Sequence, residues 1–278
     1  MVKKRYIDTR DIDSFCESLE ELLGLRQTDE MVYYWEQAIA LPNQNHGEED
    51  VLGIKEKIEK NMGNITHILF YHIGHRKETT DGGLRNLVDL LIRDSELKRY
   101  IESKGFHIIH DNNEILGLKY KGEEIPEEVF ETKCNLFSRF GKGERPDSAV
   151  NGYLFKIDIL DVNYSYVYHP EILENLKCVA KIMGATDEEA RCIVDDYNIE
   201  DITAYIYTAI VPVESISLDE GVSFADFIYN KYINTFVDYL KDKITHNEVM
   251  VFCKEGINIP ENDILEVSPL EKILKWVN

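Results

Sequence analysis

Apolar residues recur at spacings of three and four over much of the chain, which is typical of amphipathic helices. The first such stretch ends directly before Gly24 and holds six apolar positions: Ile12, Phe15, Cys16, Leu19, Leu22 and Leu23. A second helix is expected from Thr28, which acidic residues follow, and a third over residues 51–62. We therefore expect residues 1–62 to form an N-terminal helical layer.

The same periodicity predicts four helices further along the chain, over residues 84–103, 170–183, 186–197 and 224–240. Between the first two of them, Asp111, Asn112 and Asn113 separate two apolar bursts. Because Asn and Asp are favoured in tight turns, residues 106–120 are expected to form a hairpin.

Short apolar runs bounded by polar residues predict strands over residues 65–71, 151–160, 203–216, 248–252 and 257–267. Proline cannot donate a hydrogen bond within a sheet, so Pro212 indicates an edge or the end of its strand. Residues 268–278 are expected to close the chain as a short helix. The mixture of elements indicates the α+β class, with residues 63–278 as one core that follows the helical layer.

Charge and composition narrow the function classes. The chain has 278 residues, with 52 acidic against 31 basic residues and a net charge of −21. A field of that sign repels nucleic-acid backbones, although Arg139, Lys142 and Arg145 could still form a local basic groove. No apolar stretch approaches the length of a membrane span, and five scattered cysteines indicate reduced thiols in a cytoplasmic protein.

Two histidines follow the first predicted strand directly. Tyr71 ends the apolar run, and His72, His75 and Arg76 come next, where a rigid strand meets a loop. Three interpretations remain open. The two rings could bind a metal ion in a hydrolase, although no third ligand is evident and we predict no metal site. They could be hydrogen-bonded at the end of a core strand, or they could hold a polar small molecule.

The segment Tyr-His-Ile-Gly-His-Arg over residues 71–76 resembles the opening motif of DarT-type ADP-ribosyltransferases, in which a strand runs into a His-Ile-Thr-His segment that holds the nicotinamide end of NAD. Gly74 replaces the threonine, so one hydroxyl contact of the family is missing. Two later segments are similar to the wider superfamily: residues 205–216, with Tyr, Val, Pro and Ile in order, and residues 247–267, a final pair of strands.

The resemblance implies a split antiparallel sheet core of ADP-ribosyltransferase type and NAD as a substrate. The catalytic glutamate of the family opens the first strand of the final pair, which corresponds to Glu248. Breaking the bond to nicotinamide produces a ribosyl cation, and an ionised carboxylate stabilises that charge.

The other site residues follow from the chemistry of NAD. Pyrophosphate requires an arginine, because the guanidinium fork matches phosphate oxygens, and Arg139 and Arg76 are the candidates. His72 and His75 would position NAD, and Tyr71 or Tyr153 would stack on nicotinamide.

Two functions are therefore expected as alternatives. The first is a cytoplasmic NAD-dependent ADP-ribosyltransferase acting on an unknown macromolecular acceptor, as a toxin or a phage-defence effector. The second is a non-catalytic acidic protein that inhibits or binds a basic partner. A cleft that brings together His72, Arg139 and Glu248 would favour the first.

Overall fold

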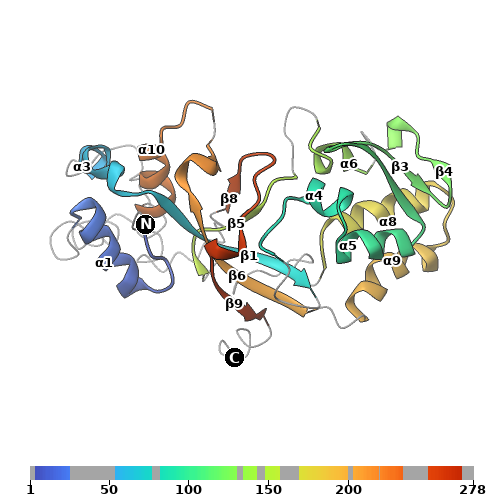
Figure 1. Ribbon diagram of the computed structural model, residues 1–278, viewed down its shortest axis with the longest axis horizontal. Coiled ribbons are helices and arrows are strands. Elements are labelled where there is room, and N and C mark those ends of the chain that lie inside the picture. The colour runs from blue at the N-terminus through green and yellow to red at the C-terminus, as the bar shows by residue number, and fades with distance from the viewer. Residues whose placement is uncertain are drawn as a thin grey trace, which may run out of the picture. The chain divides into compact units, whose positions relative to one another are not determined.

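A computed structural model describes residues 4–25, 54–76, 82–129, 134–142, 148–156, 169–199, 203–218, 220–233 and 250–270 (Figure 1). These residues form an α+β fold with eight α-helices, one six-stranded antiparallel sheet and one three-stranded antiparallel sheet. The α+β class expected from the sequence is thereby confirmed. None of the described helices is long and apolar enough to cross a membrane.

The chain divides into two compact units, each made of segments that are distant in sequence. The first unit contains Met1–His72, Asn151–Asp161 and Thr208–Phe252, and the second contains Ile73–Val150, Val162–Tyr207 and Cys253–Asn278. Residues 1–62, expected as an N-terminal helical layer, belong to the first unit, which also includes later strands.

The six-stranded sheet has the order β7-β8-β5-β1-β6-β9. Its strands are β1 (His67–Arg76), β5 (Asn151–Tyr153), β6 (Thr203–Pro212), β7 (Ile216–Ser217), β8 (Met250–Cys253) and β9 (Ile264–Pro269). If the six strands are numbered by their order in the sequence, their order across the sheet is fourth, fifth, second, first, third and sixth. β5 is antiparallel to both β1 and β8. β6 ends at Pro212, before the predicted end at residue 216, so of the two alternatives for this proline the strand end is the one observed.

The helices of the first unit are α1 (Ile12–Leu23), α3 (Ile54–Asn61) and α10 (Phe224–Ile228), and a π-helical turn, Tyr229–Ile233, follows α10. Asp11 caps the start of α1, where its side chain accepts from the Ser14 backbone N–H, and Gly24 caps the end of the helix with φ 69°. α3 contacts both α1 and α10. The rings of Phe15, Phe155 and Tyr232 pack together in the core of this unit, with centroids 5.8–6.4 Å apart.

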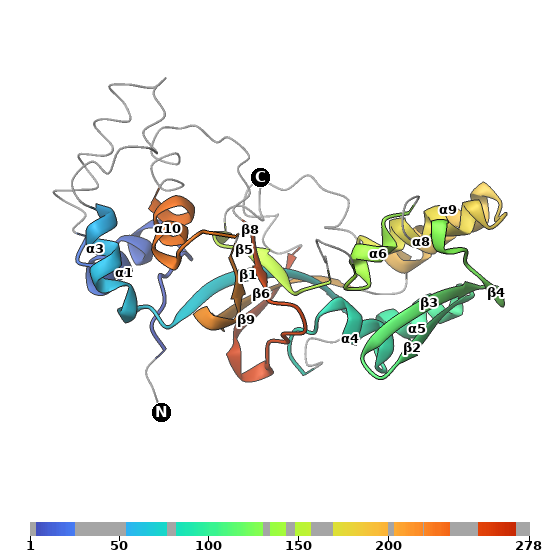
Figure 2. The same ribbon diagram turned by 90° about the horizontal axis from the view of Figure 1, so that it is seen from above.

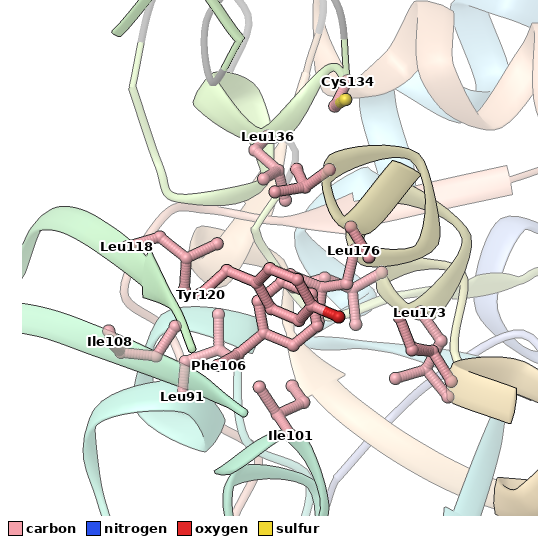
Figure 3. Packing of buried hydrophobic residues seen from close by; sticks show 14 of the residues in the cluster. Leu91, Ile101, Phe106, Ile108, Leu118, Tyr120, Cys134, Leu136, Leu173 and Leu176 are labelled. Atoms are coloured by element: carbon pink, nitrogen blue, oxygen red, sulfur yellow. The ribbon is translucent and has the colours of Figure 1, made fainter. Parts of the chain in front are cut away.

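The second unit surrounds a separate apolar core. It contains α4 (Leu87–Ile92), α5 (Glu96–Ser103), β2 (Phe106–Asp111), β3 (Glu114–Tyr120), β4 (Glu123–Glu124), α6 (Leu136–Arg139), α8 (Ile172–Ile182) and α9 (Asp187–Ile199). The predicted hairpin is β2–β3, and the two predicted helices after Pro170 are α8 and α9 (Figure 2). Side chains from the hairpin, α4, α5 and α8 meet in the core shown in Figure 3.

Several predicted elements differ from the observed ones. The strand expected over residues 151–160 ends at Tyr153, the strand expected over 257–267 begins only at Ile264, and the helix expected over 224–240 changes to a π-helical turn after Ile228. Residues 84–103 form two helices, because Ser95 has an extended backbone and begins a new helix by accepting from the Lys98 N–H. β1 continues to Arg76, five residues beyond its predicted end at Tyr71. The helix expected from Thr28 lies outside the described residues, as does most of the closing helix over 268–278, while β9 extends to Pro269.

Candidate functional site

The predicted site begins within β1 and not after it. Tyr71 is fully buried whereas His72 is half-buried. Successive side chains of a strand point to opposite faces, so these neighbours occupy different environments. The expectation that His72 would follow the strand end is wrong, since the strand continues through it.

The ring of His72 is anchored to the neighbouring strand. Its Nδ1 lies 2.6 Å from the backbone carbonyl oxygen of Asn151, the first residue of β5. A carbonyl oxygen only accepts, so Nδ1 carries the proton and donates. In the neutral ring Nε2 is then the acceptor, and the orientation of the imidazole is fixed.

Tyr71 and Tyr153 lie directly opposite each other across β1 and β5. Their exposed fractions are 0% and 3%, so both rings belong to the core of the first unit. Neither ring offers surface to a ligand in this structure, and a stacking role for either tyrosine stays a prediction.

The close approach of β1 and β5 depends on Gly152. A Cβ atom at this position would lie 2.0 Å from Cδ2 of Phe70 and 2.7 Å from the carbonyl oxygen of Tyr71. Only glycine therefore fits between these groups, and it allows the backbone of β5 to lie beside His72.

β5 also joins the site to the last strand of the first unit. Tyr153 is in register with Met250, the first residue of β8. Glu248 precedes Met250 by two positions in the sequence and lies outside the described residues. The strand that follows the predicted catalytic glutamate is thus separated from β1 only by β5.

A small hollow of about 180 Å³ lies beside β8 in the same unit. Its lining includes Met250 and Phe252 from β8, Phe227 from α10, and the polar side chains of Asn230 and Lys231. Ligand pockets usually exceed ~300 Å³, so this hollow fits only a fragment of a dinucleotide.

The remaining predicted residues among those that the structure describes lie in the second unit. The ring of His75 is half-buried, and its centroid lies 6.4 Å from that of Tyr197. Arg139 ends α6, is 11% exposed, and places Nη2 2.6 Å from Oε1 of Glu171. A phosphate bound by Arg139 would have to compete with this carboxylate. The side chain of Arg76 is outside the described part of the chain.

A metal centre finds no support in the described residues, among which no group of three or more His, Cys, Asp or Glu side chains is arranged to hold an ion. His72 and His75 are three positions apart on one strand, and such residues point to opposite faces of a regular strand. The geometry therefore does not favour one ion shared by both rings.

Asn151 and Gly152 are the site residues that the sequence did not reveal. Asn151 acts through its backbone carbonyl, and Gly152 is needed because it has no side chain. Neither role depends on a reactive side chain, so the sequence pattern does not indicate it. Comparisons of the chain with protein-family models, with curated proteins and with solved structures found no match.

Proposed function

We propose that this protein is an NAD-dependent ADP-ribosyltransferase that modifies a macromolecule, as a toxin or a phage-defence effector. The observation that carries the proposal is the order of three strands, in which β5 lies between β1 and β8. β1 holds His72, β5 ends at Tyr153, and Glu248 precedes β8 by two positions. β1, β5 and β8 come from distant parts of the sequence and are three consecutive strands of one sheet. Two of them, β1 and β8, include residues of the segments that resemble this enzyme class.

His72 would contribute a fixed acceptor. The bond from its Nδ1–H to the Asn151 carbonyl makes Nε2 the acceptor atom of the neutral ring, and in the bound complex this atom would accept from a ribose hydroxyl or from the carboxamide N–H of nicotinamide. Because the ring is oriented before NAD binds, little further ordering is required to hold the substrate.

Glu248 would act on the reacting carbon. When the bond from ribose C1′ to the nicotinamide nitrogen breaks, the bonding electrons leave with nicotinamide and positive charge develops on the ribose. A carboxylate beside the ribose stabilises that charge, and a nucleophile of the acceptor then attacks C1′.

The direct test uses NAD labelled in its adenylate part and measures both release of nicotinamide and transfer of label to macromolecules from a cell extract. We expect the wild-type chain to do both, and Glu248→Gln to lower the rate by ~100- to 1000-fold, because it removes the charge and keeps the shape. Glu214→Gln is the matched control, since Glu214 is exposed in the same unit.

Two outcomes would overturn the proposal. One is a wild-type chain that neither releases nicotinamide nor gains thermal stability with NAD. The other is an activity that Glu248→Gln and Glu214→Gln leave equally unchanged.

The net charge of −21 favours a second candidate function, that of an acidic protein which binds a basic partner without catalysis. The first of the two outcomes above, together with salt-sensitive capture of one nucleic-acid-binding protein, would support this function.

A further inference from the structure

Two cysteines of the second unit lie against each other. The Sγ atoms of Cys134, which precedes α6, and Cys178, on α8, are 2.6 Å apart. A disulfide bond is ~2.05 Å long, so a shift of about half an ångström would join them. We infer that Cys134 and Cys178 form a reversible disulfide when the protein meets a hydroperoxide. This inference does not depend on the proposed function.

The contact between the two thiols belongs to a longer packed face. Glu171, Asn175 and Cys178 are spaced by four and three residues, so they lie on one face of α8. Glu171 pairs with Arg139 at 2.6 Å, and Nδ2 of Asn175 donates to the carbonyl oxygen of Cys134 at 2.9 Å. These contacts hold the segment from Cys134 to Arg139 along α8, and the thiols meet without any unfolding.

Cys134 is buried and Cys178 is half-buried, so Cys178 is the thiol of the pair that a peroxide reaches first. Cys16 and Cys253 are buried, and burial raises the pKa of both thiols, that of Cys253 to about 12. Since the thiolate is the reactive form, these two are expected to be inert. Cys178 and Cys192 are half-buried, so Cys192, on α9, offers a comparison of similar exposure.

The chemistry requires a peroxide as the oxidant. The thiolate of Cys178, the more exposed of the pair, attacks one peroxide oxygen, which gives a sulfenic acid and releases water once the other oxygen is protonated. Sγ of Cys134 then displaces the hydroxyl group from that sulfur, which forms the S–S bond and releases a second water. Two thiols and one hydrogen peroxide thus become one disulfide and two water molecules. A small dithiol reverses the bond by exchange.

The bond would tie together residues 44 positions apart. Closing a loop restricts the unfolded chain more than the folded one, so the oxidised protein should be the more stable form. We expect its melting temperature to rise by on the order of 5 °C relative to the reduced protein.

Trypsin allows a sharp test, because each of the five cysteines lies in a different tryptic peptide. The full chain is treated with hydrogen peroxide, blocked with iodoacetamide, digested without reductant and analysed by mass spectrometry. We expect one linked species made of Cys-Asn-Leu-Phe-Ser-Arg, residues 134–139, and Cys-Val-Ala-Lys, residues 178–181. Dithiothreitol should abolish it.

Two single substitutions distinguish a specific disulfide between Cys134 and Cys178 from nonspecific oxidation of the cysteines. Cys178→Ser should remove both the linked species and the rise in melting temperature, whereas Cys192→Ser should keep both. The inference is overturned if Cys178 goes to sulfinic acid without the link, or links as readily to Cys192 as to Cys134. Circular dichroism of the reduced Cys178→Ser protein shows whether its fold is intact, and Cys178→Ala replaces it if the fold is lost.

Discussion

Nδ1 of His72 donates to the backbone carbonyl of Asn151 across two strands, over 2.6 Å and 79 positions of sequence. The bond fixes both the tautomer and the direction of a half-buried ring. It also gives the two ring nitrogens different roles, since Nδ1 donates within the fold and Nε2 is the acceptor atom of the neutral ring, which the proposed function assigns to NAD.

Asparagine at position 72 should separate these two roles. The amide nitrogen of Asn occupies nearly the place of Nδ1, so His72→Asn keeps the bond to Asn151 and lacks the acceptor at Nε2. We expect the melting temperature to change little and release of nicotinamide from NAD to fall by ~100-fold. His107→Asn, at an exposed position of β2, is the control for activity and stability. Full activity in His72→Asn would exclude a substrate contact through Nε2.

Gly152→Ala should destabilise the protein strongly. The added Cβ would lie 2.0 Å from the buried ring of Phe70 and 2.7 Å from the Tyr71 carbonyl, so the strands must separate. We expect a loss of about 1–3 kcal/mol in the free energy of unfolding by urea denaturation. Gly63→Ala is the matched control, since apart from its chain neighbours no atom of the described residues lies within 4 Å of its added Cβ. Equal stability of the two variants would contradict the close approach of β1 and β5.

Ser95→Ala should also destabilise the protein, through the start of α5. The Ser95 hydroxyl accepts from the Lys98 N–H and donates to the Leu90 carbonyl, which links α5 to α4. We expect a loss of about 1–2 kcal/mol in thermal or urea unfolding. Ser103→Ala should cost less, because the Ser103 hydroxyl, on an exposed residue in the last turn of α5, donates only within the same helix, to the Tyr100 carbonyl. Equal losses would show that the Ser95 cap is unimportant.

His169 should make stability depend on pH below neutrality. Burial lowers the pKa of His169 from 6.5, and Glu174, with Oε1 3.3 Å from Nε2, opposes this only in part. The unfolded chain therefore takes up a proton at a higher pH than the folded chain does. The contribution to stability is complete above pH 6.5 and is lost as the pH falls through the lowered pKa.

The measurement is the free energy of unfolding between pH 7.5 and pH 5.5, where one such group contributes a slope of at most ~1.4 kcal/mol per pH unit. His169→Gln should flatten the dependence, while His110→Gln, at an exposed position of β2, should leave it unchanged. A stability that falls more steeply with decreasing pH in His169→Gln than in the wild type would contradict a lowered pKa of His169.

Local signals were sufficient for several elements. Gly24 and the apolar spacing before it defined α1, the turn around Asn112 defined the β2–β3 hairpin, and the apolar spacing over residues 170–183 indicated α8. Each depends on residues within a few positions of one another, so the pattern of side chains contains the information. The same patterns missed the break at Ser95, because an apolar stripe continues across it and only the cap hydroxyl marks the new start.

The sequence by itself determined the α+β class, the positions of α1, α8 and α9 and the identity of the candidate groups, because periodicity, caps and side-chain chemistry are local properties. Tertiary structure alone decided that β5 separates β1 from β8, that the Asn151 carbonyl holds His72, and that Cys134 meets Cys178. These relationships join residues tens of positions apart, in two cases through backbone atoms that every residue shares. No local pattern can specify which distant segments pair, since that choice depends on how the whole chain buries its apolar surface.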